Sequence, residues 1–296
     1  MRDRGSRRAA HAGAWLLVCL LVGAAVSPLA AQSDGGAGAP TVVDPAPTTY
    51  VLLSGLVGGV AGFQRLRAQL MEHGQRVMVI DPYGLSIDSA DVSFAALARR
   101  VDAVLGRAGI DSAYVVGHAH GAGVALRLAA DHPRRVAALC LLDAGALASN
   151  RTRVFSASLR LVPFITRLPG GRGFVRGRFV KGLRQNAGRD GWLDEPTQRA
   201  YTEPLLDHIS AVMAMAGRLA EAAEPEAVSA VVARVRVPVT VILGTAPHPS
   251  APDSAQIAAL APLGALLRVE RLPGVGHFPH EEAPADVARR LLAPRP

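Results

Sequence analysis

From Tyr50 onward the chain alternates short apolar runs with segments of helical periodicity, and this alternation constrains the fold more than any other feature. Strands of a parallel sheet are buried on both faces, so their sequences are nearly continuous in apolar residues. Six runs have this character and predict an α/β protein with a mostly parallel, doubly wound sheet. The runs are Tyr50–Leu53, Arg76–Ile80, Ala113–Val116, Val136–Leu142, Val237–Leu243 and Leu266–Arg271.

Polar residues and a proline mark the starts of helices between these runs. Asp91 and Asp253 each precede apolar residues at helical spacing, so each predicts a helix N-terminus. Pro284 fits the first turn of the last helix. The sequence therefore predicts helices that connect successive parallel strands.

The alternation stops between Ala144 and Val235, where the pattern becomes helical with glycine-rich breaks. Helices are expected over Leu159–Leu168 and Leu205–Leu219 within this stretch. We therefore predict a helical insertion at 144–235, after the fourth strand, with the α/β core formed by 50–143 and 236–296.

The first 31 residues have the three parts of a secretory signal peptide. Four arginines precede the apolar run Ala12–Val26, and small residues follow at 27–31. We predict an exported protein, with an uncleaved N-terminal anchor as the alternative. Residues 32–49 are rich in Gly, Pro, Ala and Thr and are predicted to be a linker.

The positive charge of the chain is concentrated in one segment. The net charge is +8, and residues 151–190 alone contribute +9. Because 50% of the residues are apolar and 19% charged, wholesale disorder is excluded. The charge therefore predicts a basic surface on the insertion. We expect no nucleic-acid partner, and we keep an anionic membrane surface as a partner for 151–190.

Only one cysteine, Cys140, lies outside the predicted signal peptide. It falls inside the apolar run of the fourth strand. A disulfide framework and a cysteine metal site are therefore excluded for the mature chain.

The segment Val115–Gly123 carries the most informative motif, a strand that ends in Gly117-His-Ala119-His-Gly121 and runs into a helix. It resembles the nucleophile elbow G-x-S-x-G of the α/β-hydrolase superfamily, which has the same strand-turn-helix context. The central position holds Ala119, where the superfamily has Ser, Asp or Cys. The resemblance spans about Tyr50–Leu292 and implies an α/β-hydrolase fold whose insertion is a helical cap.

Other parts of the resemblance follow in the expected order. The segment Ser54–Gly59 resembles the oxyanion loop H-G-x-x-G, with Ser54 in place of His and Gly55 after it. The resemblance implies that the backbone amides of Leu56 and His120 form the oxyanion hole. Asp81–Gly84 resembles the D-x-x-G turn of the superfamily.

The C-terminal region resembles the part of the superfamily that supplies the catalytic histidine. Gly276-His277 is followed by Glu282 and Pro284, which implies that His277 is the catalytic histidine. The usual position of the acid holds Pro247, which cannot orient a histidine. Some members place the acid after the strand that follows the elbow helix, so Asp143 is the first substitute and Asp253 the second.

Several histidines raise the question of a metal. His118 and His120 flank the elbow, but alternate residues on such a turn point in different directions, so a shared ion is not expected. His248, His277 and His280 lie in loops after the last two strands and form a possible Zn(II) set. We predict no metal and no cofactor, and treat the three-histidine set as the alternative.

These features leave three functions open. The first is an exported hydrolase-family protein of esterase-like ancestry with a capped pocket for a small hydrophobic molecule but no serine chemistry. The second is an enzyme in which His277, with Asp143, directs water onto an ester-like or carbonyl substrate. The third is a non-catalytic protein that binds a membrane surface or other partner through the arginine-rich cap.

Overall fold

The computed structural model describes residues 48–149 and 161–293. The predicted signal peptide and nearly all of the predicted linker lie outside these ranges. In the described part of the chain, no helix is long and apolar enough to cross a bilayer.

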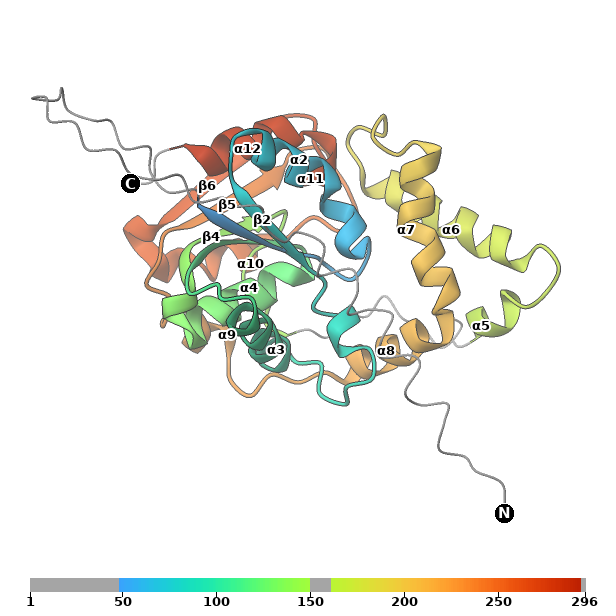
Figure 1. Ribbon diagram of the computed structural model, residues 1–296, viewed down its shortest axis with the longest axis horizontal. Coiled ribbons are helices and arrows are strands. Elements are labelled where there is room, and N and C mark those ends of the chain that lie inside the picture. Colours follow the sequence, from blue (N-terminus) through green and yellow to red (C-terminus); the bar gives the residue numbers. More distant parts are fainter. Residues whose placement is uncertain (1–47, 150–160, 294–296) are drawn as a thin grey trace, which may run out of the picture. The chain divides into compact units, whose positions relative to one another are not determined.

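A six-stranded parallel sheet in the order β2-β1-β3-β4-β5-β6 forms the centre of the fold (Figure 1). Each predicted apolar run forms one strand, which confirms the parallel α/β class. The chain leaves β1 for the edge strand β2 and returns to β3, so β1 and β3 flank a topological switch point, where α/β proteins bind ligands. The strands are β1 (Thr49–Leu53), β2 (Arg76–Ile80), β3 (Ala113–His118), β4 (Val136–Leu142), β5 (Val239–Gly244) and β6 (Leu267–Leu272).

Helices cover both faces of the sheet because successive strand residues point to opposite sides. Val51 and Leu53 of β1 belong to the buried cluster that includes α3, α4 and α9, whereas Tyr50 and Leu52 belong to the cluster that includes α2 and α12. Figure 1 shows these two layers with the sheet between them. The helices of the core are α2 (Gln64–Glu72), α3 (Phe94–Arg107), α4 (His120–Asp131), α9 (Val228–Val232), α10 (Ser254–Ala258), α11 (Pro279–Glu282) and α12 (Pro284–Leu292), with short 3-10 helices at Gly59–Phe63, Gly84–Ser86, Pro133–Arg135 and Ala261–Leu266.

Two of the three predicted helix starts are confirmed, and the third lies two residues later than predicted. Asp253 caps α10 by accepting a hydrogen bond from the Gln256 amide at 2.8 Å, and Pro284 is the first residue of α12. The cap of α3 is Ser93 instead of Asp91: the Ser93 hydroxyl accepts from the helix, and Asp91 accepts from the Ser93 amide. Asp91 thus orders the turn that places the cap.

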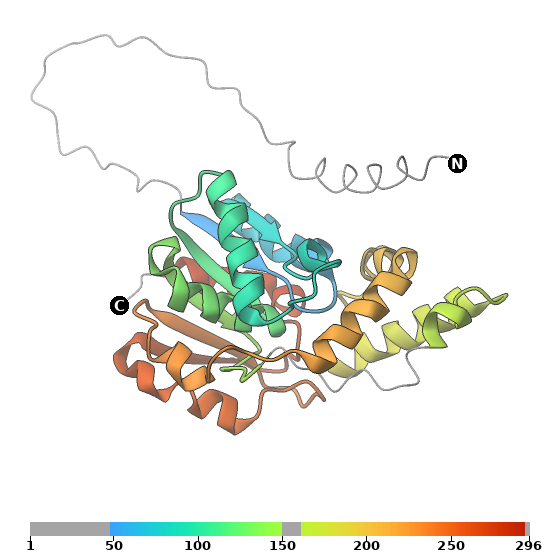
Figure 2. The same cartoon turned by 90° about the horizontal axis from the view of Figure 1, so that it is seen from below.

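The insertion forms helices that lie to one side of the sheet (Figures 1 and 2). The single helix expected over Leu205–Leu219 is two helices, because the chain breaks at His208 between α7 and α8. The first residues of the helix expected at Leu159–Leu168 lie outside the described residues. The helix α9 falls within the predicted insertion but packs into the core beside α4. The remaining insertion helices are α5 (Val162–Ile165), α6 (Gly171–Asn186), α7 (Glu195–Asp207) and α8 (Ile209–Glu221).

Cys140 lies fully buried in the middle of β4 as a free thiol, as the sequence predicts. Burial raises the pKa of this thiol. Cys140 is therefore a packing residue of the sheet.

Candidate active site

Ala119 occupies the sharp turn between β3 and α4, with a φ of 49° and a ψ of −120°. A residue with a Cβ atom is strained at positive φ, so the surrounding structure must hold this turn. Gly117 and Gly121 allow it: a Cβ atom at Gly117 would lie 2.5 Å from the Gly121 carbonyl, and one at Gly121 would lie 2.5 Å from the Leu53 carbonyl. The local sequence Gly-x-Ala-x-Gly therefore folds as an elbow that presents the Ala119 methyl group.

The predicted oxyanion loop lies next to this elbow. A Cβ atom at Gly55 would lie 3.4 Å from the Ala119 Cβ. His120 is the first residue of α4, so its amide has no acceptor within the helix. The Ser54 hydroxyl is buried and donates to Asp81 at 3.3 Å. Ser54 thus anchors the loop, while the predicted roles of the Leu56 and His120 amides stay predictions.

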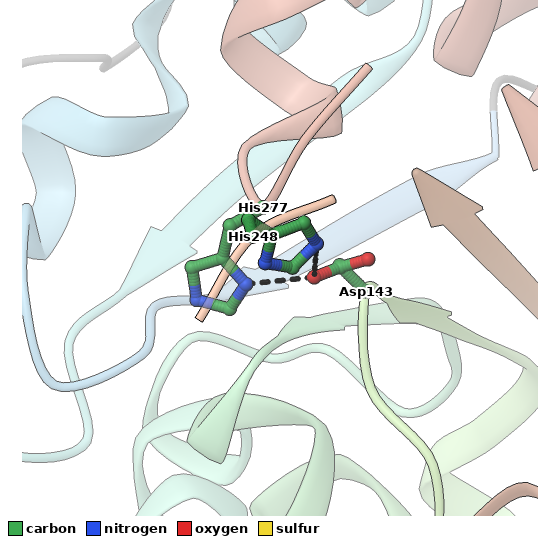
Figure 3. A group of neighbouring side chains, drawn as sticks. All are labelled: Asp143, His248 and His277. Carbon is green, nitrogen blue, oxygen red and sulfur yellow. Dashed lines mark hydrogen bonds and ion pairs between the residues drawn. The ribbon is translucent and has the colours of Figure 1, made fainter. Parts of the chain in front are cut away.

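Asp143 and His277 meet at the carboxyl ends of β4 and β6. The Nδ1 atom of His277 lies 2.7 Å from Oδ2 of Asp143 (Figure 3). The other oxygen of Asp143 accepts from the Gly244 amide at 3.2 Å. Both side chains are buried, and Asp143 itself has a positive φ of 48°. The structure therefore brings together the histidine and the first of the two acids that the sequence proposed, whereas Asp253 caps α10.

The Asp143 carboxylate is ionised at neutral pH. Burial alone would raise the pKa of Asp143, but the imidazoles of His248 and His277 beside its oxygen outweigh burial and lower the pKa to about 2. A buried carboxylate in this position fixes the orientation of an imidazole and stabilises its protonated form.

His248 is a contact of Asp143 that the sequence did not identify. It follows Pro247 in the loop after β5, and its Nε2 atom lies 3.3 Å from the same Oδ2 atom that His277 contacts (Figure 3). The signal was its position directly after the usual acid position, because the ends of β4 and β5 are neighbours in the sheet.

Three further histidines surround the pair as neutral imidazoles. Burial lowers the pKa of His118 to about 3 and the pKa of His120 to about 4, in both cases with help from the nearby His277. His118 contacts the His277 carbonyl through Nε2 at 2.8 Å and so supports the loop. His280 is buried and stacks on Phe63 with ring centroids 4.6 Å apart.

His280 does not join a metal set with His248 and His277. Among the described residues, the group whose ligand atoms all lie within 4.8 Å of one another is Asp143, His248 and His277. The predicted three-histidine alternative is therefore wrong in its third member, because the His280 ring is directed toward Phe63.

Glu282 holds the loop that carries His277. Its carboxylate accepts hydrogen bonds from the backbone amides of Gly276 and Phe278 on this loop and from those of Gly188 and Arg189 in the cap. The His277 amide donates to the carbonyl of Asn186 at the end of α6. The position of the catalytic-type histidine thus depends on the cap as well as the core.

An open groove of about 550 Å³ lies between α6 and α7 in the cap. Ala119, Asp143 and His277 do not line it, so the capped pocket at the elbow stays a prediction. The lining of this groove between α6 and α7 is partly basic and consists of Gly173, Arg176, Gly177, Val180, Lys181, Arg184, Glu195 and Gln198.

Comparison with known families gives one match over most of the chain. A sequence model described as "Alpha/beta hydrolase family" matches residues 50–290. A protein of Variovorax paradoxus named "Putative carbamate hydrolase RutD" is 37% identical over 124 residues, which are 40% of this chain and 47% of that protein. The chain thus matches about half the length of this curated relative.

Solved structures with similar folds include hydrolases of several kinds. A protein of Acinetobacter baumannii named "putative lipase" superposes with a TM-score of 0.63 and 17% identity, covering 84% of this chain and 83% of that one. The enol-lactonase from Burkholderia xenovorans has a TM-score of 0.58 and 19% identity, covering 84% of this chain and 91% of that one. At these identities the likeness concerns the fold.

Proposed function

Because the chain belongs to the alpha/beta hydrolase family, we propose that it hydrolyses small, apolar ester-like substrates by general-base activation of water, without an acyl-enzyme. The observation that carries the proposal is the contact of 2.7 Å between His277 and Asp143. Retention of an ionised, buried acid behind the histidine is the arrangement that a general base requires.

Ala119 sets the chemistry that this site can perform. The family places its nucleophile at this elbow position, and a methyl group cannot form a covalent intermediate. In the proposed reaction, Nε2 of His277 removes a proton from water as the water oxygen bonds to the acyl carbon. The amides of Leu56 and His120 stabilise the oxyanion of the tetrahedral intermediate. The intermediate then collapses, the bond between the acyl carbon and the leaving-group oxygen breaks, and His277 returns its proton to that oxygen, which releases the acid and the alcohol.

The proposed rate is low. Loss of a serine nucleophile typically costs about 10⁶-fold in turnover and leaves about 10³- to 10⁴-fold acceleration over water.

The name of the Variovorax paradoxus relative supports an acyl substrate, because a carbamate, like an ester, has an acyl carbon that water can attack.

The test uses purified protein in EDTA with p-nitrophenyl acetate and a fluorophosphonate probe. We expect slow wild-type hydrolysis that His277→Ala abolishes, and no labelling by the probe. The exposed His73 offers a matched control, His73→Ala, which should retain the wild-type rate. Hydrolysis that survives His277→Ala would refute the role of this histidine.

The Ala119→Ser variant tests whether the oxyanion amides and His277 remain arranged for acyl transfer to a serine at the elbow. If it does, the variant reacts with the fluorophosphonate, while wild type does not. A variant that folds but remains unlabelled would show that the elbow, the oxyanion amides and His277 are not in register.

Binding to a membrane surface is a second candidate function. It is supported by residues 161–174, which we term the cap tip and which carry exposed apolar side chains. Leu161, Phe164 and Phe174 in the cap tip are 59%, 60% and 61% exposed. Among the described residues, no ion pair involves Arg167 or the nearby Arg178. Apolar side chains beside basic ones suit the interface of an anionic bilayer.

Binding to vesicles tests this candidate. We expect the protein to bind phosphatidylglycerol vesicles more tightly than phosphatidylcholine vesicles, and to lose binding in high salt. The double variant Phe164→Ala/Phe174→Ala should bind weakly. The control Met71→Ala, at a residue 48% exposed on α2, should bind as wild type does. Equal binding by both variants would refute the cap tip as the contact.

We also propose that the protein is exported, on the basis of the pattern in residues 1–31. Fractionation followed by N-terminal sequencing tests this. A mature N-terminus near Gln32 is expected, and an intact protein in the cytoplasm would refute export.

A further inference from the structure

His248 has an unusual environment for an imidazole that serves only for packing. Its side chain is 1% exposed, and neither ring nitrogen has a hydrogen-bond partner among the described residues. Nε2 lies 3.3 Å from Oδ2 of Asp143, which is an ion-pair contact poorly aligned for a hydrogen bond, and Nδ1 has no such contact among the described residues. Buried polar groups in native proteins are nearly always satisfied, so an imidazole in this state indicates an absent partner.

The neighbours of His248 supply two more donor atoms of the kind that bind divalent transition metals. The ligand atoms of Asp143, His248 and His277 all lie within 4.8 Å of one another (Figure 3). Metal bonds of about 2.0–2.1 Å at the tetrahedral angle place neighbouring ligand atoms about 3.3 Å apart. Nε2 of His248 lies at this separation, 3.3 Å from Oδ2 of Asp143. Nδ1 of His277 lies closer, at a hydrogen-bond distance of 2.7 Å, so this pair would open slightly to bind a cation.

From this geometry we propose that Asp143, His248 and His277 bind a divalent transition cation of the zinc type. Two imidazoles and one carboxylate are a donor set that catalytic zinc sites use, with a fourth position left for water or a substrate atom. The His277 side chain is 11% exposed, against 1% for each of the other two, so this side of the site is the more open one. The Gly244 amide holds the second oxygen of Asp143 and so orients the carboxylate.

Metal binding and the proposed base are alternatives at one atom. The Nδ1 atom of His277 either donates to Asp143 or ligates the cation, and it cannot do both. The metal-bound protein would therefore lack the imidazole tautomer that activates water, and zinc would inhibit general-base hydrolysis. The metal site itself does not depend on hydrolysis, because binding is measured directly.

The test is titration of the full purified chain, stripped with EDTA and dialysed, with Co(II). Wild type should take up one Co(II) per chain and show the intense visible ligand-field bands of a four-coordinate ion, which Zn(II) then displaces. His248→Asn removes one ligand and leaves the contact between Asp143 and His277. It should weaken binding by more than about 100-fold, since loss of a supporting residue alone costs about 10- to 100-fold.

Two controls keep the result decisive. His280→Asn alters a buried histidine outside the proposed set and should bind Co(II) as wild type does. X-ray absorption of the zinc-loaded wild type, which needs no variant, should show two imidazole ligands. Wild type that binds no Co(II), His248→Asn protein that binds as tightly as wild type, or a zinc shell without two imidazoles would each overturn the proposal.

Discussion

The contact of Asp143 with two imidazoles makes a quantitative prediction for Asp143→Asn. The pKa of Asp143 is lowered from 3.8 to about 2. One pKa unit corresponds to about 1.36 kcal/mol, so the ionised carboxylate stabilises the folded state by about 2 kcal/mol at neutral pH. The variant should lose this amount in metal-free buffer at pH 6.

The pH dependence separates this electrostatic effect from a simple packing defect. The pKa of the group is lower in the folded state, so its contribution is present above about pH 4 and is lost as the pH falls toward 2. The difference in free energy of unfolding between wild type and Asp143→Asn should shrink from about 2 kcal/mol at pH 6 to about 1 kcal/mol at pH 3.

Urea denaturation of both proteins at pH 6 and pH 3, in EDTA, measures this difference. Asp253→Asn is the matched control, because Asn caps a helix about as well as Asp. Its difference from wild type should be small at both pH values. A difference for Asp143→Asn that is equal at pH 6 and pH 3 would refute the assigned role of the carboxylate.

Three further substitutions test the backbone packing at the elbow and two carboxyl groups on the helix that follows His277. Gly121→Ala should destabilise the protein by about 3 kcal/mol or more in thermal denaturation, because its Cβ atom would lie 2.5 Å from a backbone oxygen. The control Gly182→Ala has open space around its Cβ atom and should not destabilise it. Equal effects of the two substitutions would contradict the close packing at Gly121. Glu282→Gln should lower the free energy of unfolding by about 2 kcal/mol, because the amide nitrogen of Gln cannot accept the backbone hydrogen bonds that a carboxylate oxygen accepts. An unchanged urea midpoint would contradict this. Burial raises the pKa of Glu281 to about 8, so the stability of wild type should fall as the pH rises from about 4.5 to 8. Glu281→Gln should lack this fall. Melting temperatures of wild type and Glu281→Gln that change in parallel from pH 5 to pH 8 would contradict the prediction.

The local features of the fold were predictable because their causes are local. Apolar runs define the strands, and Gly117 and Gly121 permit the elbow. The prediction placed the cap of α3 at Asp91 instead of Ser93, since two neighbouring residues can each accept backbone hydrogen bonds. It also missed the break at His208, because periodicity continues across it.

The sequence by itself determined the parallel α/β sheet, the elbow with its alanine, and the position of His277 after the last strand. It left the acid open between Asp143 and Asp253, and it did not identify His248 as a contact of Asp143, although His248 directly follows the usual acid position. Only the order β4-β5-β6 decided these points, because adjacent parallel strands bring their carboxyl ends, and the loops that follow them, to one edge of the sheet. His248 and His277, each more than a hundred positions from Asp143 in the sequence, thereby contact the same oxygen of its carboxylate.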